Sequence, residues 1–204
     1  MKKHILGICV LIFVCFSSIF ATEDVREKYS NVTTFQAKFK QTIHISSSDS
    51  LREFSGEFFY KKKRGFLWVY KSPRLRYFLF DGQYLYQYDE ERPFIIKEKV
   101  DPSKTKKYFL DLIEDLTNLE THFRLKERIS DKNYEILNLE PKTDEMITAL
   151  RIWFGKDLTV KKIEIVEKTG NRNTLIFNSV VLNGEISDER FVFKKDRRKE
   201  VIER

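Results

Sequence analysis

Residues 61–73 read KKKRGFLWVYKSP, a run in which basic residues lead directly into aromatic and aliphatic side chains. Successive side chains of a strand point to opposite faces, so Phe66, Trp68 and Tyr70 share one face and the intervening aliphatic residues share the other. Both faces of this predicted strand are apolar. Each face must therefore be covered by another part of the folded chain or by a bound molecule.

The basic residues Lys61 to Arg64 allow two interpretations of this strand. Cations beside an apolar surface suit an amphiphile with a negative or polar head group. Alternatively, the aromatic residues belong to an ordinary core and the cations form a solvated turn. For any one aromatic or for the cluster alone, the ordinary interpretation is the more common one.

The chain around this run repeats the same period-two pattern. Upstream, Phe35, Ala37 and Phe39 alternate with polar residues, which predicts a half-buried strand. The pair Asp81-Gly82 predicts a hairpin turn between two further strands. The other predicted strands are 53–61, 65–70, 76–80, 84–88, 94–99, 123–129, 134–140, 147–154, 160–167, 173–182 and 190–193. About eleven meandering antiparallel strands predict a mainly β fold, an open or incomplete β-barrel.

Two short helices are predicted beside the strands. In 23–31, Val25 and Tyr29 are spaced to share one face of an amphipathic helix. A second helical pattern opens at Asp101-Pro102-Ser103, where proline follows an acidic capping residue. In this second helix, Leu112 and Ile113 share an apolar face.

The first 21 residues have the composition of a secretory signal. A basic start is followed by an apolar run of about 16 residues, which is shorter than the roughly 20 that a membrane span needs. We expect cleavage after Ala21, export to the periplasm, and a single domain over residues 22–204; an uncleaved anchor is the alternative. Cys9 and Cys15 both lie in this segment, and Ile12-Phe13-Val14 before Cys15 is too bulky for a lipid-attachment motif.

The remaining chain carries no recognisable catalytic pattern. It contains no cysteine, and its only histidines are His44 and His122. Its carboxylates show no metal-ligand or acid–base spacing, so we expect no enzyme activity, no metal and no cofactor. Without Lys2 and Lys3 the formal charge is 36 − 31 = +5. In an exported protein this mild excess favours an anionic membrane surface or an acidic partner over nucleic acid.

In their order along the chain, several short motifs resemble the LolA family of outer-membrane lipoprotein carriers. The similarity covers nearly all of the chain after residue 21, and its strength lies in the ordered set of motifs. The motifs are FQAKFKQ (35–41), SG (55–56), FLW (66–68), YKSP (70–73), DGQYLYQYD (81–89), LEP (139–141) and FVF (191–193).

The resemblance implies a helical lid over an apolar cavity in an incomplete barrel. Family members take lipid-modified proteins from an inner-membrane Lol ATP-binding-cassette transporter and deliver them to an outer-membrane acceptor such as LolB. We expect the protein to act this way as a monomer. A family arginine six residues before the tryptophan helps to keep the lid closed; Lys62 stands at that spacing here, and Arg64 is a possible substitute. Phe66 matches a family aromatic that receives cargo.

These arguments give a set of candidate residues and a rival function. The candidates for binding acyl chains are Phe39, Phe58, Tyr60, Phe66, Trp68, Phe78 and Phe80 on the sheet, and Val25, Tyr29, Leu112 and Ile113 on the helices. The rival is a lipid- or lipoprotein-sensing module of the same fold in an envelope regulatory pathway. A structural accessory protein of the outer membrane is a third possibility, but it would need an anchor.

Overall fold

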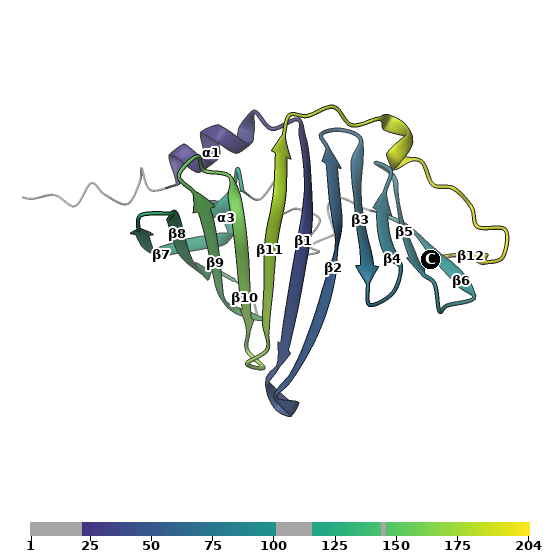
Figure 1. The fold of residues 1–204 in the computed structure, drawn as a ribbon, viewed down its shortest axis with the longest axis horizontal. Coiled ribbons are helices and arrows are strands. Elements are labelled where there is room, and N and C mark those ends of the chain that lie inside the picture. The colour runs from purple at the N-terminus through teal and green to yellow at the C-terminus, as the bar shows by residue number, and fades with distance from the viewer. Residues whose placement is uncertain (1–21, 101–115, 144–145) are drawn as a thin grey trace, which may run out of the picture.

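The computed structural model describes residues 22–100, 116–143 and 146–204. The predicted signal segment and the helical pattern that contains Leu112 and Ile113 lie outside these ranges. The described part is a broad, curved sheet with a short helix packed at one end (Figure 1). None of its helices is both long enough and apolar enough to cross a bilayer.

The sheet has twelve strands in the order β12-β6-β5-β4-β3-β2-β1-β11-β10-β9-β8-β7, with β7 and β12 at its two edges. This confirms the predicted mainly β, open architecture. The strands are β1 Thr34–Ile45, β2 Ser50–Lys61, β3 Gly65–Ser72, β4 Arg76–Phe80, β5 Tyr84–Asp89, β6 Phe94–Lys99, β7 Phe123–Ser130, β8 Tyr134–Pro141, β9 Ile147–Gly155, β10 Val160–Glu167, β11 Arg172–Leu182 and β12 Glu200–Glu203. The helices are α1 Glu23–Ser30 and α3 Leu119–His122, with 3-10 turns η1 Ser46–Ser48 and η2 Asp188–Phe191.

The predicted last strand, Arg190–Phe193, is wrong. Its first half ends η2, where the Ser187 hydroxyl accepts a hydrogen bond from the Glu189 amide at 3.3 Å. Phe191 is fully buried, and the ring of Phe193 stacks on Tyr86 at 4.1 Å. The alternation in this segment therefore reflects rings that pack on the sheet rather than a strand within it.

The true last strand, β12, pairs with β6 in parallel, whereas all other neighbouring strands are antiparallel. The expectation of a purely antiparallel sheet is corrected at this one edge. The cause is the path of residues 183–199, which run from the end of β11 across the sheet to its far side (Figure 1). A chain that returns across the sheet can enter the edge parallel to its neighbour.

Both faces of the central strands carry an apolar cluster, as the apolar character of β3 predicts. We call the face that carries Phe35 and Trp68 the inner face, and its core continues through α1 and β7–β11. The opposite, outer face carries a smaller cluster that contains Phe59 and Leu79. Phe191 belongs to this smaller cluster, so residues 183–199, which we call the C-terminal segment, supply cover for part of the outer face.

The predicted hairpin turn at Asp81-Gly82 is confirmed, and the structure adds a close strand approach at Gly56. The Asp81-Gly82 pair turns β4 into β5, with Gly82 at φ +97° and the Asp81 carboxylate accepting hydrogen bonds from the Gln83 and Tyr84 amides at 2.9 and 2.8 Å. Gly56 faces Phe39 across β1 and β2. A Cβ at position 56 would lie 1.8 Å from the Val69 carbonyl oxygen, so only glycine lets β3 approach this closely.

Candidate functional site

The candidate wall residues of the sheet come together on the inner face. Phe39, Phe58 and Trp68 form the centre of this wall, with ring centroids 4.9 Å apart for Phe39–Trp68 and 4.8 Å for Phe58–Trp68. The ring of Phe66 lies 5.6 Å from that of Phe80 on the neighbouring strand, at a tilt of 30°. The same apolar cluster contains Phe39, Phe58, Tyr60, Phe66 and Trp68 as buried residues and Phe78 and Phe80 as partly buried ones.

The wall is not equally exposed along the sheet. Phe58 and Trp68 on β2 and β3 are almost fully buried, whereas Tyr70, Phe78 and Phe80 towards β4 remain partly exposed. Neighbouring aromatic side chains that stay accessible together can form a contiguous apolar patch, the kind of surface that receives another molecule. The accessible end of the aromatic wall therefore lies at β3–β4.

Phe54, Tyr70 and Arg76 all lie at this accessible end, although the sequence did not single them out as candidate site residues. The guanidinium of Arg76 lies over the rings of Phe54 at 5.2 Å and Tyr70 at 4.8 Å. Burial raises the pKa of Tyr70 to about 12, although the Arg76 charge acts in the opposite direction. Tyr70 is thus a neutral hydroxyl at physiological pH. The period-two pattern placed Tyr70 on the correct face, but the cation over it depends on a neighbouring strand and has no sequence signal.

Helix α1 packs its predicted apolar residues against the far end of the same core. Val25 and Tyr29 are 1% and 2% exposed. The Tyr29 hydroxyl accepts a hydrogen bond from the Val160 amide at 2.9 Å and donates one to the Leu158 carbonyl at 3.2 Å. Burial raises the pKa of Tyr29 well above its usual range, so the side chain stays neutral and bonded. The amphipathic prediction for α1 is therefore confirmed.

Ion pairs connect the N-terminal end of α1 to the strands. Arg128 on β7 pairs with Asp24 of α1 at 2.7 Å and also with Glu135 on β8 at 3.3 Å. The hydrogen bond to Asp24 is the main cause that raises the pKa of Arg128. Hydrogen bonds from Lys156, Ser130 and Arg128 lower the pKa of Glu135 to about 2. Arg128 therefore remains charged, with an ionised Glu135 beside it.

The two candidate latch residues have different environments. The Lys62 ammonium lies 3.3 Å from the Ser30 carbonyl, where it interacts with the negative end of the α1 dipole. The Arg64 guanidinium instead donates to the Asp81 carbonyl at 3.0 Å, in the β4–β5 turn. Of the two cations, Lys62 is the one that contacts α1. Lysine lacks the planar bidentate fork of arginine, so this contact is a point-charge interaction.

The Arg128–Asp24 pair predicts a measurable effect on the docking of α1. Arg128→Gln should speed hydrogen exchange of the α1 amides by about two- to fivefold, because a partly exposed ion pair contributes about 0.5–1 kcal/mol. Amides at the centre of β1 and β2 should not change. Mass spectrometry of the exchanging protein measures both regions.

The matched control is Arg124→Gln, on the same strand, because Arg124 is 72% exposed and lies 3.9 Å from Glu140 rather than near α1. Equal acceleration of α1 exchange in both variants would contradict a role for the Arg128–Asp24 pair in holding α1 docked. A double-mutant cycle with Asp24→Asn should recover a coupling of about 0.5–1 kcal/mol.

Neither a metal site nor the small pocket beside α1 adds a candidate site in the described parts of the chain. Residues 22–100, 116–143 and 146–204 contain no group of three or more His, Cys, Asp or Glu side chains that could hold a metal ion. A pocket of about 110 Å³ lies between Thr22 and Arg26 at α1 and the segment Leu116–Thr121. It is too small for more than a few water molecules.

Comparisons with known proteins agree with the resemblance of the motifs. The family described as "Outer membrane lipoprotein carrier protein LolA" matches residues 30–194. An outer-membrane lipoprotein carrier protein of Francisella tularensis is 26% identical over 204 residues, which cover 100% of this chain and 98% of the relative. Its counterpart from Pseudomonas entomophila is 27% identical over 171 residues, 83% of this chain and 82% of the relative.

A solved structure shares the fold at low sequence identity. An uncharacterized conserved protein from Thermus thermophilus is 12% identical, covers 90% of this chain and 97% of its own, and has a TM-score of 0.59. This likeness concerns the fold alone. The family match covers most of the open sheet and the whole aromatic wall, and on that ground the chain belongs to the LolA family of outer-membrane lipoprotein carriers.

Proposed function

We propose that this protein is a periplasmic carrier that shields the acyl chains of lipoproteins between the inner and the outer membrane. The observation that carries the proposal is the aromatic wall of the inner face, which stays partly exposed at Tyr70, Phe78 and Phe80. Burying one CH₂ group gains about 0.8 kcal/mol, so one 16-carbon chain represents roughly 12 kcal/mol. An acyl chain cannot cross water without such a surface.

In this proposal the accessible end of the wall receives the acyl chain and α1 acts as a lid. Val25 and Tyr29 close the wall at the α1 end, and Lys62 and the Arg128–Asp24 pair help to keep the helix docked. A few weak polar contacts suit a lid that must also open and release cargo. Leu112 and Ile113, outside the described residues, remain predicted contributors to the lid.

The location and the partners are part of the same proposal. Cleavage of residues 1–21 would deliver the chain to the periplasm as a monomer. An inner-membrane Lol ATP-binding-cassette transporter would load it, and a LolB-like or other outer-membrane acceptor would unload it. The family names of the relatives support lipoprotein cargo, while the donor and the acceptor are inferred from the resemblance alone.

The test is chemical extraction followed by an assay of transfer. We expect protein purified from the periplasm to yield about one equivalent of lipoprotein or acyl chain by organic extraction and mass spectrometry. The purified protein should also release lipoproteins from spheroplasts. If the purified protein carries no acyl chains and releases no lipoproteins, the carrier proposal is wrong and the lipid-sensing module is favoured.

A further inference from the structure

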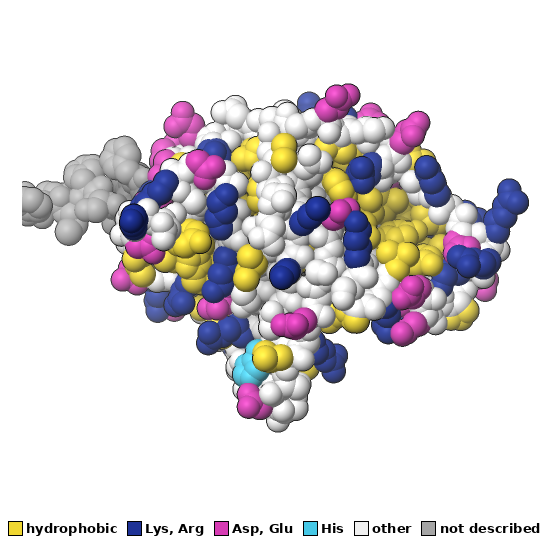
Figure 2. Space-filling model, in the orientation of Figure 1, with side chains coloured by type: hydrophobic (Ala, Val, Ile, Leu, Met, Phe, Trp, Pro, Cys, Tyr) yellow, Lys and Arg dark blue, Asp and Glu magenta, His cyan; other side chains and the backbone are white. Residues whose placement is uncertain are grey.

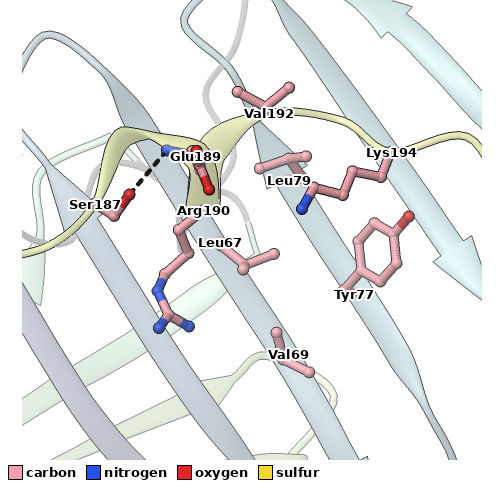
Figure 3. Close-up of a pocket in the computed structure, with 9 residues that line it drawn as sticks. All are labelled: Leu67, Val69, Tyr77, Leu79, Ser187, Glu189, Arg190, Val192 and Lys194. Atoms are coloured by element: carbon pink, nitrogen blue, oxygen red, sulfur yellow. Dashed lines mark hydrogen bonds between the residues drawn. The ribbon is translucent and has the colours of Figure 1, made fainter.

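A second apolar surface lies on the outer face, opposite the aromatic wall. It is a groove of about 520 Å³ between η2 with the chain after it and the strands β3 and β4 (Figure 3). Its floor is formed by Leu67, Val69, Tyr77 and Leu79. We call this surface the outer groove. Hydrophobic side chains are visible over β3–β5 beside the C-terminal segment, with basic side chains around them (Figure 2).

The C-terminal segment covers the outer face only in part. Phe191 and Phe193 point to the sheet and anchor the segment on Phe59, Leu79 and Tyr86. Val192 between them is 49% exposed, at the edge of the groove. The segment is thus fixed by its two rings, which bury Leu79, whereas Leu67, Val69 and Tyr77 of the floor remain partly exposed to a binding partner.

Two cations from the same segment border this apolar floor. Arg190 and Lys194 extend from the C-terminal segment over the strands, with Leu67 between them (Figure 3). Arg190 lies 4.0 Å from the centre of the Phe59 ring. Within the described ranges neither cation has an ion-pair partner. A cation over an apolar surface is suited to an anionic group that approaches with its own apolar neighbour.

Two acidic residues of the segment are paired with cations outside the groove. Asp188 is engaged by Lys61 at 2.5 Å, and Asp196 by Arg198 at 3.0 Å. Glu189 also lines the groove, so the groove itself carries two cations and one carboxylate. The excess positive charge selects for an acidic partner.

We propose that the outer groove binds an extended segment of a partner protein that presents an acidic side chain next to an aliphatic or aromatic one. The charge complementarity with Arg190 and Lys194 and the apolar floor carry this assignment together. Cations alone would equally suit an anionic membrane surface, and binding to vesicles is therefore the competing outcome of the test. The proposal goes beyond the carrier function and does not depend on it, because the groove and the aromatic wall lie on opposite faces of the sheet.

Selection from a random library tests this chemistry without a known partner. Phage that display random twelve-residue peptides are selected on the immobilised, purified full chain, and the enriched peptides are synthesised with a fluorophore for anisotropy titrations. We expect the enriched peptides to carry Asp or Glu within three positions of an aliphatic or aromatic residue. The double variant Arg190→Glu/Lys194→Glu should weaken their binding at least tenfold.

The matched control is Lys38→Glu/Lys40→Glu, which makes the same charge change at exposed positions of β1 on the same face. It should change the affinity less than twofold. Peptides without acidic residues, or equal binding to both double variants, would overturn the proposal. A second binding experiment uses vesicles of phosphatidylglycerol and phosphatidylethanolamine in place of peptides. If Arg190→Glu/Lys194→Glu loses binding to vesicles but not to peptides, the surface is a membrane site and the peptide proposal fails. Lipoprotein release from spheroplasts, measured separately, reports on the carrier function alone.

Discussion

Phe35→Ala should lower the free energy of unfolding by about 3–5 kcal/mol, the range for truncating a buried phenylalanine. Phe35 is 0% exposed, on a strand between β2 and β11. Its ring lies 5.7 Å from Phe58 and 5.8 Å from Phe177. Removing it leaves a cavity at the point where both halves of the sheet meet. Urea unfolding followed by circular dichroism measures the loss.

The same substitution at a partly exposed ring is the control for Phe35. Phe54 lies near the far end of β2 and keeps part of its surface in water. Phe54→Ala should therefore lower the free energy of unfolding by less than half as much as Phe35→Ala, because it removes less buried apolar area and leaves no enclosed cavity. Similar losses in the two variants would mean that Phe35 is not at the centre of the core.

The sequence predicted the regular part of this fold because the inner face obeys simple alternation. Phe35, Ala37 and Phe39 appear at period two and are all buried. The Asp81-Gly82 turn likewise follows from local backbone preferences. In each case the signal and the structure it specifies lie within a few residues of one another.

The C-terminal segment shows where such local reasoning ends. The alternation of Phe191, Val192 and Phe193 has the same pattern as a strand, yet the two rings pack on the outer face of the sheet and the segment does not join it. Whether an apolar segment pairs as a strand within a sheet or packs on the face of that sheet depends on strands that are distant in the sequence. β12 is only a four-residue strand, and its parallel pairing depends on the path of the preceding segment.

The residues of the candidate site likewise fall into those that a local sequence pattern identifies and those that only the structure identifies. Spacing from Trp68 identified Lys62, and the structure places its ammonium at the end of α1. Arg128 was not identified, because it stands among other charges in β7 and its partner Asp24 is 104 residues away in the sequence. Ion pairs between distant elements leave no local pattern, so the polar contacts of a lid must be found from the structure.

Phe78→Glu should reduce lipoprotein release from spheroplasts by at least tenfold while the protein stays folded. Phe78 lies on β4 at the accessible end of the wall, 6.4 Å from Tyr70, and is partly exposed. A glutamate there can keep its carboxylate in water in the empty protein, so stability should change little. A bound acyl chain would remove that water, and burying an unpaired carboxylate costs several kcal/mol. A difference of about 1.4 kcal/mol is already tenfold in affinity.

The choice of position and control makes this test specific to the wall. Phe66 is 4% exposed, so Phe66→Glu would bury the charge in the empty protein and confound loss of function with loss of fold. Ile176→Glu is the matched control, because Ile176 is 43% exposed on β11 and points away from the buried Leu175 and Phe177. It should retain release activity. If Phe78→Glu and Ile176→Glu release lipoproteins equally well, acyl chains do not bind at the β3–β4 end, and the site must lie elsewhere on the molecule.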